Sequence, residues 1–291
     1  MRKAGKIGFN DAKLSLEHPL RSLSILPLRT LRPRVTRALY LGIYRRYRPR
    51  RFHAYCVGAL KSGTHSIAGM LMRDYRSSHE PRVPELIDAV LALSRREIPK
   101  RDLQQLVHRR DKALWLEMES SAFNVHVLDL LVQEFPHARF ILTIRDCYSW
   151  VDSALNHQLG RKLPKQYESF LRYWIAPGGE YTPAESVLKD HGLYSLKSYF
   201  RAWANHNQRV LDTVPPDRLL VIRMDEISQS ERIAGFLGIP VGTLDRDRSH
   251  SFRSRKRFDL MSAIDPDYVR QAAQEACKPL MTRFFPEFTD I

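Results

Sequence analysis

The sequence is poor in cysteine and has no long apolar run, and each shortage excludes a class of protein. Its three cysteines, Cys56, Cys147 and Cys277, are widely spaced and odd in number, so they form neither a disulfide framework nor a zinc-ligand pattern. No segment approaches the ~20 consecutive apolar residues that a membrane-spanning helix needs. No small-residue cleavage site follows the short apolar stretch at residues 38–44. We therefore expect a cytoplasmic protein without a secretory signal.

Acidic residues are scarce at the start of the chain. Residues 1–52 contain 14 Lys and Arg but only Asp11 and Glu17, which leaves +12 of the total net charge of +15 in this segment. Leucines and isoleucines are interleaved with the arginines. Such an arm can contact an anionic membrane surface, an acidic substrate or nucleic acid, or it can pack on the domain. We expect an N-terminal arm at residues 1–50, with possible peripheral membrane contact and no specific nucleic acid, and one domain at residues 51–291.

After the arm, short β-rich segments alternate with amphipathic helical patterns. This alternation is typical of a parallel sheet covered by helices. The patterns predict strands at residues 54–58, 113–118, 139–144 and 218–223. They predict helices at residues 64–76, 85–95, 101–110, 122–135, 147–159, 193–213, 230–237 and 266–285, and a loop at 176–190. The sequence thus predicts one α/β domain with a central parallel sheet flanked by helices.

The most informative motif follows the first expected strand. The chain there reads Gly-Ala-Leu-Lys-Ser-Gly-Thr-His-Ser over residues 58–66. A strand, a glycine-containing loop and a helix N-terminus in this order favour an oxyanion site, because backbone N–H groups of Gly63 and Thr64 would point at the anion. Lys61 adds a positive charge. A Walker A loop has its lysine after the second glycine, whereas Lys61 precedes Gly63, which weakens the interpretation as an ATP or GTP loop.

A second basic element lies at the end of another expected strand. The apolar segment at residues 139–144 ends in Arg145, and Ser153 follows on the next expected helix. Open parallel sheets bind ligands at the carboxyl ends of their strands, which is where Arg145 would lie. The structural alternative is an ion pair between Arg145 and Asp146 or Asp152.

Together the two elements resemble those of sulfotransferases that use 3′-phosphoadenosine 5′-phosphosulfate (PAPS). The loop is similar to that family's 5′-phosphosulfate loop, whose core reads Lys-Ser-Gly-Thr-Thr/Ser, and Arg145 with Ser153 resembles its 3′-phosphate element. The segment from Tyr199 to Pro240 also resembles the family's helix, strand, acidic corner and Phe-Leu-Gly-Leu-Pro-like helix end. The resemblance covers about residues 52–260. It implies a P-loop-like fold of the bacterial or heparan-type branch.

The resemblance implies a role for each matching residue. Lys61 would be catalytic, stabilising the bridging oxygen and the leaving phosphate; a surface lysine in a turn is the alternative. Arg145 and Ser153 would hold the 3′-phosphate, and Arg255 and Lys256 would belong to a basic loop that closes on the cofactor, unless that basic run is only solvated. The residues expected to contact the 5′-phosphosulfate are Lys61, Ser62, Gly63, Thr64, His65 and Ser66.

Two positions depart from the family's pattern. Cytosolic sulfotransferases carry a tryptophan five residues after the loop lysine to stack on adenine, and this position is Ser66 here. The proline that usually follows the 3′-element is Cys147. Both departures favour the bacterial or heparan-type branch over the phenol-and-steroid branch. They leave the adenine platform unidentified.

The general base has two carboxylate candidates, Glu80 and Glu119. Glu80 lies just beyond the helix after the loop and resembles the glutamate of heparan-type enzymes; a polar turn before Pro81 is the alternative. Glu119, with Glu117 nearby, replaces a lysine of those enzymes. This replacement argues against an acidic polysaccharide acceptor. The alternative for Glu119 is a structural role as a helix cap. His65 is a further possibility, although a cofactor contact suits it better.

We therefore expect an enzyme that transfers the sulfuryl group of PAPS to a hydroxyl, less readily an amine, of a carbohydrate, lipid or secondary metabolite. A P-loop nucleotide kinase is one alternative, but no Walker B-like strand ending in aspartate is evident. A nonenzymatic membrane- or nucleic-acid-binding protein using its basic arm is another. The eleven histidines form no ligand-spaced cluster, so we expect no metal. The acceptor is not encoded in the expected substrate-facing segments, residues 79–110 and 160–192.

Overall fold

The computed structural model describes residues 48–160, 162–176, 180–249 and 257–288. The predicted arm at residues 1–50 lies almost entirely outside the described residues, so the division into arm and domain stays a prediction. Arg255 and Lys256 also lie outside them. Within the described ranges no helix is long and apolar enough to cross a membrane.

Within the described part of the chain, five short strands form one parallel sheet in the order β2-β3-β1-β4-β5. This confirms the α/β class with a central parallel sheet flanked by helices. The strands are β1 (Ala54–Cys56), β2 (Ser77–His79), β3 (Met118–Ser120), β4 (Arg139–Ile144) and β5 (Leu219–Arg223).

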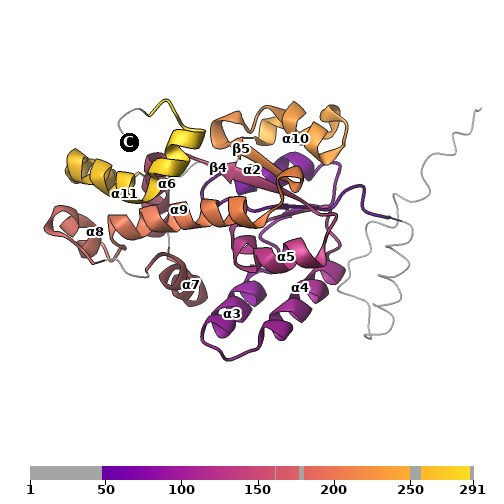
Figure 1. Ribbon diagram of the computed structural model, residues 1–291, viewed down its shortest axis with the longest axis horizontal. Helices are drawn as coiled ribbons and strands as arrows, with labels where there is room; N and C mark the ends of the chain where they lie inside the picture. Colours follow the sequence, from indigo (N-terminus) through magenta and orange to yellow (C-terminus); the bar gives the residue numbers. More distant parts are fainter. Residues whose placement is uncertain (1–47, 161, 177–179, 250–256, 289–291) are drawn as a thin grey trace, which may run out of the picture. The chain divides into compact units, whose positions relative to one another are not determined.

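Helices cover both faces of this sheet (Figure 1). The α-helices of the described residues, not all of which touch the sheet, are α2 (Thr64–Leu71), α3 (Val83–Ser94), α4 (Lys100–Leu114), α5 (Leu128–Glu134), α6 (Cys147–Leu159), α7 (Lys165–Ile175), α8 (Ser186–Asp190), α9 (Leu196–Thr213), α10 (Ser230–Leu237) and α11 (Pro266–Phe284). A 3-10 helix, η2 (Ala122–Val127), precedes α5.

The alternation of side chains along the strands separates the two faces. Ala54 and Cys56 of β1 pack with residues of α2 and α10 in one buried cluster. Tyr55 and Val57, which point the other way, pack with α3, α4, α5 and α9 in a second cluster. Because both faces are covered, β4 is mostly apolar, and Thr143 is the one polar residue in its buried run Phe140–Ile144.

Three predicted elements need correction. The strand predicted at 113–118 begins only at Met118, because α4 continues to Leu114 and ends where Trp115 adopts a positive φ of 50°. The helix predicted at 64–76 ends at Leu71, and the chain turns into β2, which the sequence did not predict. α7 was also not predicted, and the expected loop at 176–190 contains the short helix α8.

Candidate functional site

A cavity of about 800 Å³ lies at the carboxyl ends of the strands. Residues that follow β1, β2, β4 and β5 line it, together with the segment after α11. Topology explains this arrangement, because parallel strands end at one edge of the sheet and their loops converge there. The cavity brings together these predicted residues: Lys61, Gly63, Thr64, His65, Ser66, Glu80, Arg145 and Ser153.

Two glycines shape the loop that follows β1. A Cβ on Gly58 would lie 2.0 Å from Oγ1 of Thr143 on β4, so no larger residue fits between loop and sheet. Gly63 has a φ of 103°, and a Cβ there would lie 2.4 Å from Cδ1 of Ile227. A side chain at Gly58 would displace the loop, because the backbone oxygen of Thr143 also lies within 2.7 Å, whereas a side chain at Gly63 would be strained by the positive φ.

The Ser62 side chain packs between the loop and β4 and does not line the cavity. Its hydroxyl donates to the carbonyl oxygen of Ala59 at 2.7 Å and lies 3.1 Å from Oγ1 of Thr143. Its backbone N–H also bonds to the Ala59 carbonyl. The prediction that Ser62 contacts a ligand is therefore not supported by this geometry.

The N-terminus of α2 opens onto the cavity through Gly63, Thr64 and His65. The first N–H groups of a helix have no partner within the helix, and the helix dipole adds a partial positive charge there. Lys61, which has a φ of 64°, lies directly before this end and lines the same cavity. The combination favours an anionic group.

Two histidines beside this end are neutral at neutral pH. Burial and then the charges of Arg248 and Lys61 lower the pKa of His65. Burial and then His65 lower the pKa of His79 to about 4. Nε2 of His79 lies 3.2 Å from Oγ1 of Thr64, and the two imidazole rings are 5.0 Å apart. On this wall the positive charge therefore comes from Lys61, and Arg248 lies close enough to act on His65.

Arg145 lines the cavity from the end of β4. Its Nε donates to the hydroxyl of Ser149 at 2.7 Å, and its carbonyl oxygen accepts from Nε1 of Trp203 at 2.9 Å. Asp146 caps α6 by accepting from the N–H of Ser149 at 2.8 Å. Burial lowers the pKa of Arg145, and two nearby carboxylates oppose this effect. Ser153, one helical turn beyond Ser149, lines the same cavity.

Glu80 reaches the cavity from the end of β2. His79 of this strand pairs with Ser120 of β3, and the N–H of Glu80 continues the ladder with a 2.9 Å bond to the Ser120 carbonyl. Oε1 of Glu80 lies 3.8 Å from Nε2 of His79, and the Glu80 side chain is 24% exposed. Of the two predicted base candidates, this is the one that lines the cavity.

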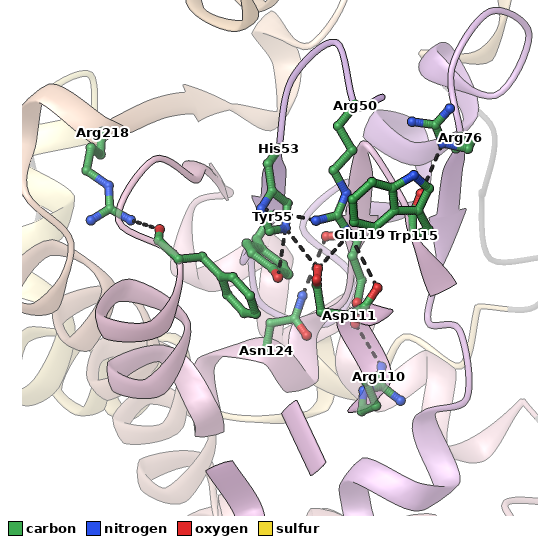
Figure 2. A network of polar contacts seen from close by, with 11 residues as sticks. Arg50, His53, Tyr55, Arg76, Arg110, Asp111, Trp115, Glu119, Asn124 and Arg218 are labelled. Atoms are coloured by element: carbon green, nitrogen blue, oxygen red, sulfur yellow. Dashed lines mark hydrogen bonds and ion pairs between the residues drawn. The ribbon is translucent and has the colours of Figure 1, made fainter. Parts of the chain in front are cut away.

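Glu119 lies outside the cavity, so the structure does not support the prediction that it acts as a base. Its side chain is buried, with Oε1 2.8 Å from Nη2 of Arg110 (Figure 2). Burial raises the pKa of Glu119, and Arg110 opposes the rise. Glu117 is fully buried as well and accepts bonds from Arg51 and from the N–H of Arg76.

Sequence reasoning missed a wall of the cavity formed by the end of β5 and the segment after α11. Arg223 ends β5 and forms ion pairs with Asp225 at 2.9 Å and Glu287 at 2.5 Å. Its guanidinium also lies 4.7 Å from the ring centre of Phe285. Arg145 was predicted because it lies at the carboxyl end of an expected strand, and the same argument could have identified Arg223. No local motif marks Phe285 or Glu287.

A family model described as a sulfotransferase domain matches residues 55–250 of this chain. The comparison with curated proteins gives no match.

Among solved structures, a sulfotransferase from Alicyclobacillus acidocaldarius is similar, with 18% identity, coverage of 82% of this chain and 94% of that chain, and a TM-score of 0.44. Sulfotransferase STF9 from Mycobacterium avium has 13% identity, coverage of 86% and 82%, and a TM-score of 0.41. The sulfotransferase domain from the curacin biosynthetic pathway has 14% identity, coverage of 77% and 89%, and a TM-score of 0.35.

Proposed function

Because the chain belongs to the sulfotransferase family, we propose that it transfers the sulfuryl group of PAPS to a hydroxyl group. The acceptor would be a carbohydrate, lipid or secondary metabolite, with an amine as the less favoured alternative. One observation carries the proposal: Lys61 with the α2 N-terminus, and Arg145 with Ser153, line the same cavity although about eighty residues separate them. This is the arrangement that a nucleotide with phosphates at both ends requires.

The residues present fit such a nucleotide. A cavity of about 800 Å³ lies within the range of cofactor sites, roughly 300–1,000 Å³. Lys61 and the N–H groups at the start of α2 would hold the 5′-phosphosulfate. Arg145 and Ser153 would hold the 3′-phosphate by a charge-assisted bond and a hydroxyl contact. PAPS, when bound, supplies the sulfuryl group and leaves as 3′-phosphoadenosine 5′-phosphate.

The protein's share of the chemistry is positioning and charge neutralisation, as in phosphoryl transfer. Lys61 would neutralise the charge that develops on the leaving phosphate oxygen. Glu80 would accept the hydroxyl proton while the acceptor oxygen bonds to sulfur. Since His65 and His79 are neutral near neutral pH, they can hydrogen-bond to reacting groups without adding charge.

Titration calorimetry of the full chain tests the donor. We expect 3′-phosphoadenosine 5′-phosphate to bind at least about tenfold more tightly than AMP, because AMP lacks the phosphate assigned to Arg145. We expect binding to persist in EDTA and after deletion of residues 1–50. ATP that binds more tightly, and only with Mg²⁺, would instead favour a nucleotide kinase. Loss of all binding on deletion of the arm would favour a binding protein that uses that arm.

Transfer from PAPS to a panel of N-acetylglucosamine, galactosylceramide and 4-nitrophenol then tests the reaction and narrows the acceptor. We expect sulfation of at least one hydroxyl in the panel. Tight nucleotide binding combined with no release of 3′-phosphoadenosine 5′-phosphate from PAPS, with or without acceptors, would contradict catalysis.

A further inference from the structure

The turn that carries Glu80 into the cavity has an unfavourable backbone. Glu80 and Arg82 have φ values of 49° and 50°, in the left-handed region that residues other than glycine seldom adopt. Such conformations persist only where surrounding contacts determine them, and they concentrate at functional sites. The contacts that hold this turn therefore bear on where the Glu80 carboxylate lies.

Arg110 of α4 makes two of those contacts. Its Nη1 donates to the carbonyl oxygen of Arg82 at 2.8 Å, and its Nη2 donates to the carbonyl oxygen of Pro81 at 2.9 Å. The same Nη2 lies 2.8 Å from Oε1 of Glu119. Arg110 is only 4% exposed, so its planar guanidinium is fixed in place.

Glu119 connects Arg110 to β3, and β3 in turn holds the first residue of the turn, Glu80. It lies on β3 next to Ser120, whose carbonyl accepts from the N–H of Glu80 at 2.9 Å. The Ser120 hydroxyl donates to the carbonyl oxygen of Thr64, at the start of α2, at 2.6 Å. β3 thus connects the Glu80 turn with the proposed phosphosulfate site. Figure 2 shows Arg110 meeting Glu119 within this network.

We propose that Arg110 and Glu119 are positioning residues that fix the turn at Glu80–Arg82, so that the Glu80 carboxylate faces the reacting hydroxyl. The inference rests on the proposed function, in which Glu80 is the general base. Arg110 supplies the bonds to the turn, and Glu119 balances the charge of Arg110 in a buried setting. Neither residue touches the substrate.

The double variant Arg110→Met with Glu119→Gln tests the pair. Removing both charges together avoids leaving an unpaired buried ion, so the variant should fold. We expect kcat for release of 3′-phosphoadenosine 5′-phosphate, with the best panel acceptor, to fall about 10- to 100-fold, since a misplacement of ~1 Å can cost about 10²-fold. We expect its binding constant for 3′-phosphoadenosine 5′-phosphate to stay within about twofold of wild type, because Lys61 and Arg145 are untouched.

A matched control lies one residue further along α4. Asp111 pairs with Arg50 at 2.6 Å, both side chains are 12% exposed, and neither residue lines the cavity. The variant Arg50→Met with Asp111→Asn should keep kcat. The single variant Arg110→Lys, which keeps the charge but not the guanidinium fork, should have an intermediate kcat.

Amide hydrogen exchange provides a readout that does not depend on activity. The N–H of Glu80 should exchange faster in the Arg110–Glu119 double variant than in wild type or in the control variant. Unchanged kcat in the double variant, unchanged exchange at Glu80, or an equal loss of kcat in the control variant would each overturn the inference. Wild-type turnover in Glu80→Gln would also overturn it, while nucleotide binding would still support the sulfotransferase function. A wild-type chain that binds no 3′-phosphoadenosine 5′-phosphate would overturn the proposed function itself.

Discussion

The two ends of the sheet both concentrate basic side chains but surround them differently. At the amino ends of the strands, an amino-end network pairs arginines with carboxylates; its members are Arg50, Arg51, His53, Arg76, Asp111 and Glu117. At the carboxyl ends, Arg145 donates to the hydroxyl of Ser149, which in turn donates to Asp146, and Lys61 lies beside the neutral His65. The first arrangement balances charge within the protein. At the carboxyl ends Arg223 is also paired, with Asp225 and Glu287, and it is the part of the wall with Lys61 and Arg145 that suits a ligand carrying negative charge.

This difference separates residues that stabilise the fold from residues that bind and react. A buried carboxylate among arginines needs its partners, since removing one side leaves a charge without compensation. A cation on a cavity wall is partly hydrated and gains most when an anion displaces that water. Substitutions at the two ends should therefore be distinguishable by measuring stability and ligand affinity side by side.

The largest expected effect is at Lys61. We expect Lys61→Ala to reduce the rate of transfer from PAPS by about 10²–10³-fold, as removal of one preorganised electrostatic contact does. Single-turnover kinetics measure this rate, and the melting temperature should change little because Lys61 is not a core residue. Lys278→Ala, an exposed lysine on α11, serves as the control. A wild-type rate in Lys61→Ala would show that the carboxyl-end wall does not contribute to the reaction as proposed.

A smaller and more selective effect is expected at Arg145. Arg145→Met should weaken binding of 3′-phosphoadenosine 5′-phosphate by about 10- to 100-fold, since a hydrogen bond to a charged group contributes about 1.5–3 kcal/mol. AMP affinity should hardly change, because AMP has no 3′-phosphate. Calorimetry with both nucleotides measures the difference. An equal loss for both would mean that Arg145 supports the shape of the cavity and does not select the 3′-phosphate.

Two of the cavity's basic residues, Lys61 and Arg145, could be predicted because each belongs to a local pattern. Lys61 follows an apolar strand within a glycine-containing loop, and Arg145 follows another apolar strand, so the strand pattern and the parallel topology place both at one sheet edge. β2 could not be predicted in this way. Its Ser-Ser-His sequence has no apolar residue, and it becomes a strand only by pairing with β3.

The choice between Glu80 and Glu119 also depended on tertiary structure. Glu80 and Glu119 each lie beside a short segment with a weak strand pattern. Nothing in the neighbouring sequence indicates which of the two carboxylates pairs with a buried arginine. Arg110, which pairs with Glu119, comes from a helix that the sequence shows only as amphipathic. An ion pair between residues on different elements leaves no recognisable sequence pattern, so it could not be predicted.

The last expected effect, on stability rather than on binding, concerns Glu117 in the amino-end network. Burial by itself would raise the pKa of Glu117, but hydrogen bonds from Arg51 and the N–H of Arg76 outweigh burial and hold the pKa below its ordinary value of 4.5. A depressed native pKa contributes stability that is present above 4.5 and is lost as the pH falls through the native value. We therefore expect Glu117→Gln to lower the free energy of unfolding at pH 7 by about 2 kcal/mol.

Urea denaturation at several pH values measures that cost. The difference between wild type and Glu117→Gln should shrink as the pH falls below 4.5, because protonation removes the same charge from wild type. Glu231→Gln breaks an exposed pair with Arg246 and should cost far less stability than Glu117→Gln. Affinity for 3′-phosphoadenosine 5′-phosphate should not change in either variant. If Glu117→Gln weakens that affinity as strongly as Arg145→Met, the two ends of the sheet are energetically coupled, and the separation of stabilising from binding residues fails.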